Sequence, residues 1–162
     1  MLGQTPETLA VMLAPVDDAT LRTRPEAGEW CPLEIVGHLI ACDSGAFRDR
    51  IRAIVSGDGV IPAFRPWDAI DARDFAAEPL DDLLDELRAE RETSTAYLAT
   101  LTAEDLARTG SMEAYPGVFA AGDFVHEWPF HDQEHFQQIL ACTKLAYLPH
   151  MSDTMRDALT GQ

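Results

Sequence analysis

Apolar residues recur at intervals of three and four along several segments of this chain, and this spacing is typical of helices that bury one face. The longest run comprises Val36, Leu39, Ile40, Phe47, Ile51 and Ile54. It predicts a helix that begins at Pro32, after a capping box formed by Cys31 and Glu34, and ends at the Ser56-Gly57 stop signal. We find no segment with the alternating apolar pattern of a half-buried strand, so the sequence predicts an all-α protein.

Three further helices are predicted from similar signals. Thr5-Pro6 is a helix start, and the first helix should run from Pro6 to about Leu13. A third helix should span residues 79–100 and a fourth residues 123–147. Pro129 should kink the fourth helix or mark its true start. A chain of 162 residues fits a single domain, 1–162, so we expect one four-helix bundle.

Two long connections join these helices. Residues 57–78 contain Pro62 and Pro66 together with Phe64, Trp67 and Phe75, and they lack helical periodicity. Loops of this length in compact domains usually build or cover a site, and the aromatic residues indicate that this one packs onto the protein. Residues 110–122 form the second connection. Two crossovers permit an up-up-down-down or related order, in which the second and fourth helices face one another.

His131 and His135 lie four residues apart on the fourth helix, so their side chains are only about 40° apart around its axis. His38 lies two turns into the second helix. If the two helices face one another, the three imidazoles can bind one divalent metal ion and leave a coordination position open, as in catalytic sites. Alternatively, the three histidines simply fill a polar core.

A polar stripe on the fourth helix supports the metal site. Glu127, His131, His135, Gln138 and Cys142 follow one another at steps of three or four residues. Each buried polar group without a partner would cost roughly 1 to 3 kcal/mol. A metal ion with supporting hydrogen bonds would offset these costs, so Glu127 and Gln138 are candidates for contacts behind the ligands.

The cysteines do not suggest a site of their own. Cys31, Cys42 and Cys142 are an odd number without CxxC spacing, which argues against a disulfide framework or a cysteine zinc site. Cys42 lies one turn beyond His38 on the same face and is therefore a possible neighbour of the ion. A buried cysteine is, however, more often a small core residue than a ligand.

Three other residues are candidates for substrate binding. Arg91 falls within the apolar stripe of the third helix, and its guanidinium could hold a carboxylate of a substrate; a buried ion pair with Asp43 or Glu34 is an equally good interpretation. Trp30 and Trp67 could line the pocket, although large aromatic residues more often belong to the core.

Charge and hydropathy exclude several classes of partner. The formal net charge is −16, from 12 basic and 28 acidic residues, and no basic cluster reverses it locally, so binding to nucleic acid is not expected. No apolar run approaches the roughly 20 residues of a membrane span, and the first residues lack a basic signal-peptide region. We therefore expect a soluble, cytoplasmic protein without a membrane partner.

The segment HDQEH, residues 131–135, also matches the H-x-x-E-H motif of one class of metalloproteases, in which Glu134 would be the general base. The motif is short, and those proteases need a larger scaffold and an acidic third ligand. The remaining histidines, His126 and His150, are interpreted as surface or loop residues.

Two segments of the chain together resemble a known family. They are RPEAGEWCPLEIVGHL at residues 24–39 and HDQEHFQQI at residues 131–139, and residues 84–106 are also similar to that family's third helix. The family is the DinB/YfiT-like superfamily, and the resemblance extends over residues 21–145. Cys31 stands where the family usually has Ser or Thr, and Pro129 is atypical.

This resemblance implies a four-helix bundle of up-down-down-up order, commonly a homodimer, with a divalent metal on His38, His131 and His135. It also implies low-molecular-weight thiols as substrates, because members with known activity are thiol S-transferases or a thiol-dependent isomerase. Zinc and nickel both suit imidazole ligands. Our main hypothesis is a metal-dependent transferase that joins a small thiol to an electrophilic acceptor. The alternative is a metal-binding or ligand-binding bundle without catalysis, acting as a stress-response sensor or interaction module.

Overall fold

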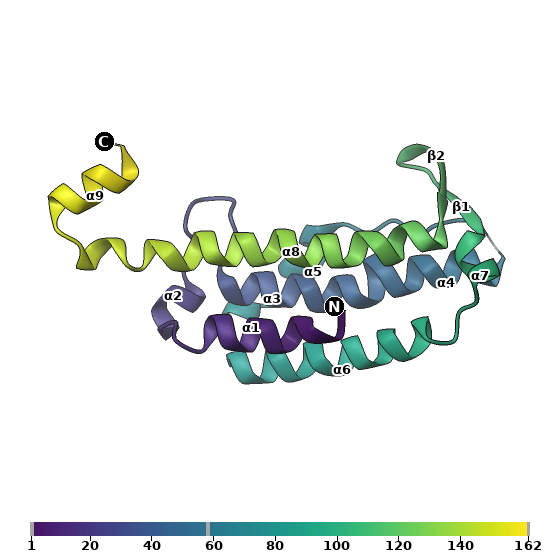
Figure 1. Ribbon diagram of the computed structural model, residues 1–162, viewed down its shortest axis with the longest axis horizontal. Helices are drawn as coiled ribbons and strands as arrows, with labels where there is room; N and C mark the ends of the chain where they lie inside the picture. Colours follow the sequence, from purple (N-terminus) through teal and green to yellow (C-terminus); the bar gives the residue numbers. More distant parts are fainter. Residues whose placement is uncertain (1, 58, 162) are drawn as a thin grey trace.

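The computed structural model describes residues 2–57 and 59–161 and shows a four-helix bundle (Figure 1). The first helix is α1 (Thr5–Leu13), the third is α6 (Leu80–Leu98) and the fourth is α8 (Ala121–Leu145). The second is one continuous rod made of α3 (Pro32–Ala41), the π-helical segment η2 (Cys42–Arg48) and α4 (Asp49–Ser56). The predicted all-α bundle is thus confirmed.

The helices follow the up-down-down-up order that the family resemblance implies, and not an up-up-down-down order. In Figure 1, α1 and α8 run in one direction, whereas the α3–α4 rod and α6 run in the other. Because the second and third helices are parallel, the chain must return along the whole length of the bundle between them. This return explains the long connection between Gly57 and Leu80.

Local sequence signals define the ends of the second rod. The carboxylate of Glu34 accepts a hydrogen bond of 2.9 Å from the Cys31 backbone N–H, which caps α3 as predicted. The rod ends at Gly57, whose φ of 101° lies in the left-handed region that glycine adopts without strain. The π-helical segment between them was not predicted. Such wide turns are frequent at functional sites, and here the turn begins at Cys42, one turn after His38.

The core consists of two apolar clusters. One packs α1 and α6 against α3 and includes Leu9, Leu33 and Leu87, all fully buried. The other packs η2 and α4 against α8 and includes Phe47 and Trp128, whose rings stack at a centroid distance of 4.7 Å. These clusters hold the α3–α4 rod against α8 over much of its length.

Both long connections contain regular structure that the sequence did not predict. The first includes a short helix, α5 (Pro66–Ala72), and the 3-10 turn η3 (Phe75–Ala77). The second is an antiparallel hairpin of β1 (Thr109–Met112) and β2 (Tyr115–Ala120). Its strands are only four and six residues long, β1 has a single apolar residue, and Pro116 and Gly117 interrupt β2, so neither strand shows a recognisable alternating pattern.

Pro129 lies inside α8 and does not mark its start, because the helix begins at Ala121, eight residues earlier. The remaining elements are η1 (Leu2–Gln4), α2 (Asp18–Arg22), α7 (Ala103–Ala107), η4 (Leu148–His150) and α9 (Asp153–Thr160). In Figure 1, α9 lies beyond the end of the bundle. Over the described residues, no helix is both long and apolar enough to cross a bilayer.

The first long connection packs onto the rod through glycines, as its aromatic residues predicted. A Cβ atom added at Gly37 would lie 2.3 Å from Cγ of Phe75, and one at Gly45 would lie 2.8 Å from Phe64. The missing side chains therefore allow two phenylalanine rings of the connection to pack directly on the helix that carries His38.

We expect the Gly37→Ala substitution to lower the free energy of unfolding by about 1 to 2 kcal/mol. Overpacking a buried contact costs roughly 1 to 3 kcal/mol, and the better helix propensity of alanine offsets part of it. Chemical denaturation measures the change. Gly3→Ala is the control, because no atom lies within 4 Å of its added Cβ. An unchanged stability of the Gly37→Ala protein would show that Phe75 does not pack there.

Candidate metal centre

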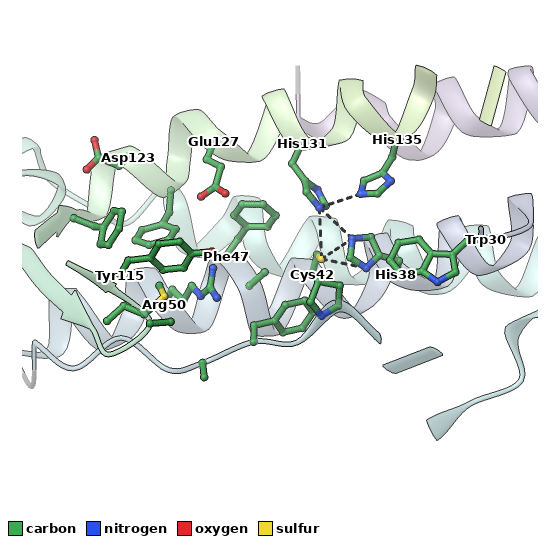
Figure 2. A pocket seen from close by; sticks show the side chains of 18 residues that line it. Trp30, His38, Cys42, Phe47, Arg50, Tyr115, Asp123, Glu127, His131 and His135 are labelled. Atoms are coloured by element: carbon green, nitrogen blue, oxygen red, sulfur yellow. Dashed lines mark hydrogen bonds between the residues drawn. The ribbon is translucent and has the colours of Figure 1, made fainter. Parts of the chain in front are cut away.

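The three predicted histidines come together in the bundle interior. Nε2 of His131 lies 3.1 Å from Nε2 of His38 and 3.1 Å from Nε2 of His135 (Figure 2). One ligand atom from each of the three lies within 4.8 Å of the other two. His38 comes from α3, and His131 and His135 come from α8. The second and fourth helices therefore face one another, as a shared site for the three histidines requires.

Burial keeps these imidazoles neutral. Burial, and after it the charge of the neighbouring imidazoles, lowers the pKa of His38 to about 3 and that of His131 to about 4. The pKa of His135 is also lowered, again mainly by burial. Neutral imidazole is the form that binds metal ions, so the three side chains are ready to act as ligands at neutral pH.

The geometry fits a tetrahedral cation. Zinc with bonds of about 2.0–2.1 Å to nitrogen holds neighbouring ligand atoms about 3.3 Å apart, close to the two separations of 3.1 Å. A proton on Nε2 of His131 could bridge to only one of its two neighbours, whereas a cation interacts with all three lone pairs at once. The described residues therefore form a site suited to one divalent metal ion.

Gln138 lies where a supporting residue was predicted. Its Oε1 is 2.9 Å from Nδ1 of His135, so it can accept the proton on that nitrogen and leave Nε2 free for a metal. Glu127 lines the pocket beside the histidines, but it forms no hydrogen bond to any of them within the described chain. Nδ1 of His131 is buried without a hydrogen-bond partner among the described residues.

Cys42 adjoins the metal centre as well as the core. Its Sγ lies 3.3 Å from Nε2 of His38 and 3.8 Å from Nε2 of His131. Burial raises the pKa of the Cys42 thiol above its ordinary value, since a thiolate loses solvation there. Cys42 is therefore a neutral thiol beside the three histidines.

A pocket of about 990 Å³ opens beside the histidines, at the upper end of the range for small-molecule sites. Its lining is largely aromatic and aliphatic and comes from η2, the first long connection, the β-hairpin and α8. Polar groups gather in two places, the three histidines and a group formed by Arg50, Asp123 and Glu127 (Figure 2).

Of the two tryptophans predicted at the pocket, only Trp30 lines it. The Trp30 side chain is almost fully buried, and its ring centroid lies 4.6 Å from that of His38. Trp67 is 42% exposed and packs against Trp30 with ring centroids 4.8 Å apart. Trp67 thus supports the pocket wall from α5 without reaching the cavity.

Arg91 lies in the core and does not line the pocket. Its guanidinium donates to the Asp43 carboxylate at 2.8 and 2.9 Å and to the Asp132 carboxylate at 2.6 and 3.1 Å. The structure therefore contains the ion pair with Asp43 that was the alternative to substrate binding. Glu34, the other partner considered, is instead bound by Arg24.

This buried network adjoins the candidate metal centre, and sequence reasoning identified Asp43 as a partner of Arg91 but missed Asp132. Asp132 directly follows His131 and also accepts a hydrogen bond of 2.6 Å from Thr5. Asp43 accepts one of 3.1 Å from Trp128 Nε1. Arg91 thereby joins η2 to α8 next to the ligands. A signal for Asp132 was present, because it lies one turn after Trp128 on the buried face of α8, where an unpaired charge would be costly.

Glu134 does not take the position of a protease general base. Its side chain is exposed and is not part of the pocket lining. The carboxylate that does reach the pocket from α8 is Glu127, one turn before His131. The H-x-x-E-H interpretation therefore lacks its catalytic residue in this fold.

Comparison with known proteins agrees with the fold. The family profile of the DinB superfamily matches residues 1–139. The structure is similar to that of YfiT from Bacillus subtilis, described as a probable metal-dependent hydrolase with an unusual four-helix bundle topology. The TM-score is 0.79 at 18% sequence identity, over 90% of this chain and 83% of that chain. No curated protein matches the sequence.

Proposed function

The chain belongs to the DinB superfamily, and we propose that it is a metal-dependent enzyme that transfers a low-molecular-weight thiol to an electrophilic acceptor. The observation that carries the proposal is the convergence of His38, His131 and His135 at the wall of a large apolar pocket. Three neutral ligands leave the +2 charge of zinc or nickel uncompensated, and a divalent ion held there would lower the pKa of a thiol that binds to it.

The side chains of the protein hold the proposed ligands in place and exclude water from the pocket. Gln138 orients His135, and the Arg91 network fixes the backbone beside His131. Aromatic rings on several elements line the cavity and exclude water from an organic substrate: Trp30, Phe47, Phe64, Phe119 and Phe124. A largely apolar wall favours a thiol and an organic electrophile over water as the reacting pair.

The test is a thiol-transfer assay with protein purified without a tag and loaded with zinc or nickel. A panel of small thiols is mixed with 1-chloro-2,4-dinitrobenzene, so that a carbon–sulfur bond forms while chloride and the thiol proton are released. We expect metal-dependent turnover that His135→Ala abolishes and His126→Ala retains, because His126 is exposed and outside the pocket. Circular dichroism verifies that both variants are folded.

Two other outcomes would contradict the proposal. A metal-loaded protein that consumes none of the thiols would favour the non-catalytic sensor or interaction module. Metal-dependent cleavage of a chromogenic ester without any thiol would favour a hydrolase, which is the activity suggested in the description of YfiT.

A further inference from the structure

The end of the pocket away from the histidines contains an arginine that the proposed reaction does not yet use. Arg50 projects from α4 into the cavity, and Figure 2 shows it on the Tyr115 side of the pocket, opposite the Trp30 side. Among the described lining residues it is the only arginine or lysine. It is therefore the one fixed positive charge that a molecule in this pocket can reach.

The guanidinium of Arg50 is only partly engaged by the protein. Its Nε donates one long hydrogen bond of 3.3 Å to the carbonyl oxygen of Pro62, and its Cζ lies 5.7 Å from the centre of the Phe124 ring. No carboxylate lies within ion-pair distance of it in residues 2–57 or 59–161. Most of its five N–H donors thus remain available to a ligand.

The surroundings of Arg50 strengthen the interaction with an anion. The side chain is partly buried and lines the pocket together with Phe124, Tyr115 and Met112, where water screens charge less than at the surface. The molecule as a whole is strongly acidic, with a formal charge of −16, so an anion is retained only where a cation faces it. Glu127 lines the same region and competes for the guanidinium.

From this arrangement we infer that Arg50 is a carboxylate-binding subsite, and that the pocket takes an organic ligand with a carboxylate at one end. Under the proposed function, on which this last step rests, the ligand is a carboxylate-bearing thiol whose sulfur lies at the histidines. The guanidinium binds a planar carboxylate through two parallel hydrogen bonds, a geometry that a neutral thiol does not offer.

Calorimetry on the zinc-loaded full-length protein tests the inference with matched probes. We expect 6-mercaptohexanoate to bind at least roughly tenfold more tightly than 6-mercaptohexanol, because only the carboxylate forms charged hydrogen bonds with the guanidinium. Arg50→Gln should remove this preference. Arg52→Gln should keep it, because Arg52 is exposed on the same helix, where it pairs with Asp49. Equal affinities in the unaltered protein, or a preference that persists in Arg50→Gln, would overturn the inference.

A substitution that should strengthen carboxylate binding distinguishes a binding role of Arg50 from a merely structural one. Glu127→Gln removes the competing carboxylate, so the affinity for 6-mercaptohexanoate should rise and that for 6-mercaptohexanol should not change. A general loss of structure would weaken both. An unchanged preference in Glu127→Gln together with a retained preference in Arg50→Gln would assign the selectivity to another part of the protein.

The same measurement with hexanoate and hexanol separates this inference from the proposed function. These probes lack sulfur, so a preference for hexanoate that Arg50→Gln removes supports the subsite even if no thiol is turned over. A preference that survives in Arg50→Gln indicates that the carboxylate binds the zinc, which contradicts the subsite. Thiol turnover without any preference for hexanoate or 6-mercaptohexanoate would leave the enzyme proposal in place and reject the role of Arg50.

Discussion

Replacing Arg91 with methionine is expected to lower the free energy of unfolding by about 3 to 5 kcal/mol, as for the loss of one partner from a buried ion pair. The substitution leaves the carboxylates of Asp43 and Asp132 facing each other in the core, where, among the residues that the structure describes, only Thr5 and Trp128 still donate to them. Natural domains are stable by only about 5–15 kcal/mol, so the loss is a large fraction of the total. Denaturant unfolding at neutral pH measures it.

Two further variants make this expectation specific. Arg88→Met on the same helix should cost no more than about 1 kcal/mol, because Arg88 pairs with Glu7 at the surface. Combining Arg91→Met with Asp43→Asn and Asp132→Asn should restore part of the stability, since the buried negative charges are then removed. Equal effects of Arg88→Met and Arg91→Met would show that burial of the network is not what stabilises it.

Replacing His131 with alanine is expected to weaken binding of zinc by more than roughly a hundredfold. Loss of a supporting contact alone typically costs 10- to 100-fold in metal affinity, and His131 is a proposed ligand whose Nε2 lies 3.1 Å from those of both other histidines. Two remaining imidazoles on different helices cannot complete a tetrahedral site. Competition with a chromogenic chelator measures the affinity, and elemental analysis should give one ion per chain before the substitution.

Gln138→Ala and His126→Ala calibrate this result. Gln138→Ala should weaken zinc binding by roughly 10- to 100-fold, because His135 loses the acceptor that fixes its ring. His126→Ala should leave the affinity unchanged, since His126 lies outside the three-histidine group. Zinc binding that survives in His131→Ala but is lost in His126→Ala would move the metal site elsewhere.

The structure links these two predictions. Asp132 is held by Arg91 and Thr5, and its neighbour in the chain is His131. The ion pair therefore holds α8 against η2 next to His131, one of the proposed metal ligands. A protein without Arg91 should bind metal more weakly even when all three histidines are present.

Much of the candidate site could be predicted from the sequence because helical geometry is local. The spacing of His131 and His135 places them on one face of any helix, whatever the rest of the fold. The apolar stripe around His38 required that residue to face the interior. The resemblance of residues 24–39 and 131–139 to a family indicated that His38 shares a site with His131 and His135. Gln138 followed from the same three- and four-residue steps.

Other features depended on contacts between elements that lie far apart in the chain. The direction of the third helix is decided by packing, because an amphipathic stripe is the same whichever way its helix runs. The choice between a substrate contact and an ion pair for Arg91 required the positions of Asp43 and Asp132, which lie 48 and 41 residues away. The shape of the pocket depends on the β-hairpin, whose short strands give a weak sequence signal.

The sequence by itself therefore determined the four long helices and the interior face of each, since these follow from a period of 3.6 residues. It gave the three candidate ligands through the spacing of His131 and His135 together with the family resemblance. Only the tertiary structure decided which charges neutralise one another and which remain available. Arg91 and Arg50 are the same residue type on helices of the same bundle. The first is surrounded by two carboxylates, whereas the second faces an open pocket, and that difference depends on the packing of distant segments.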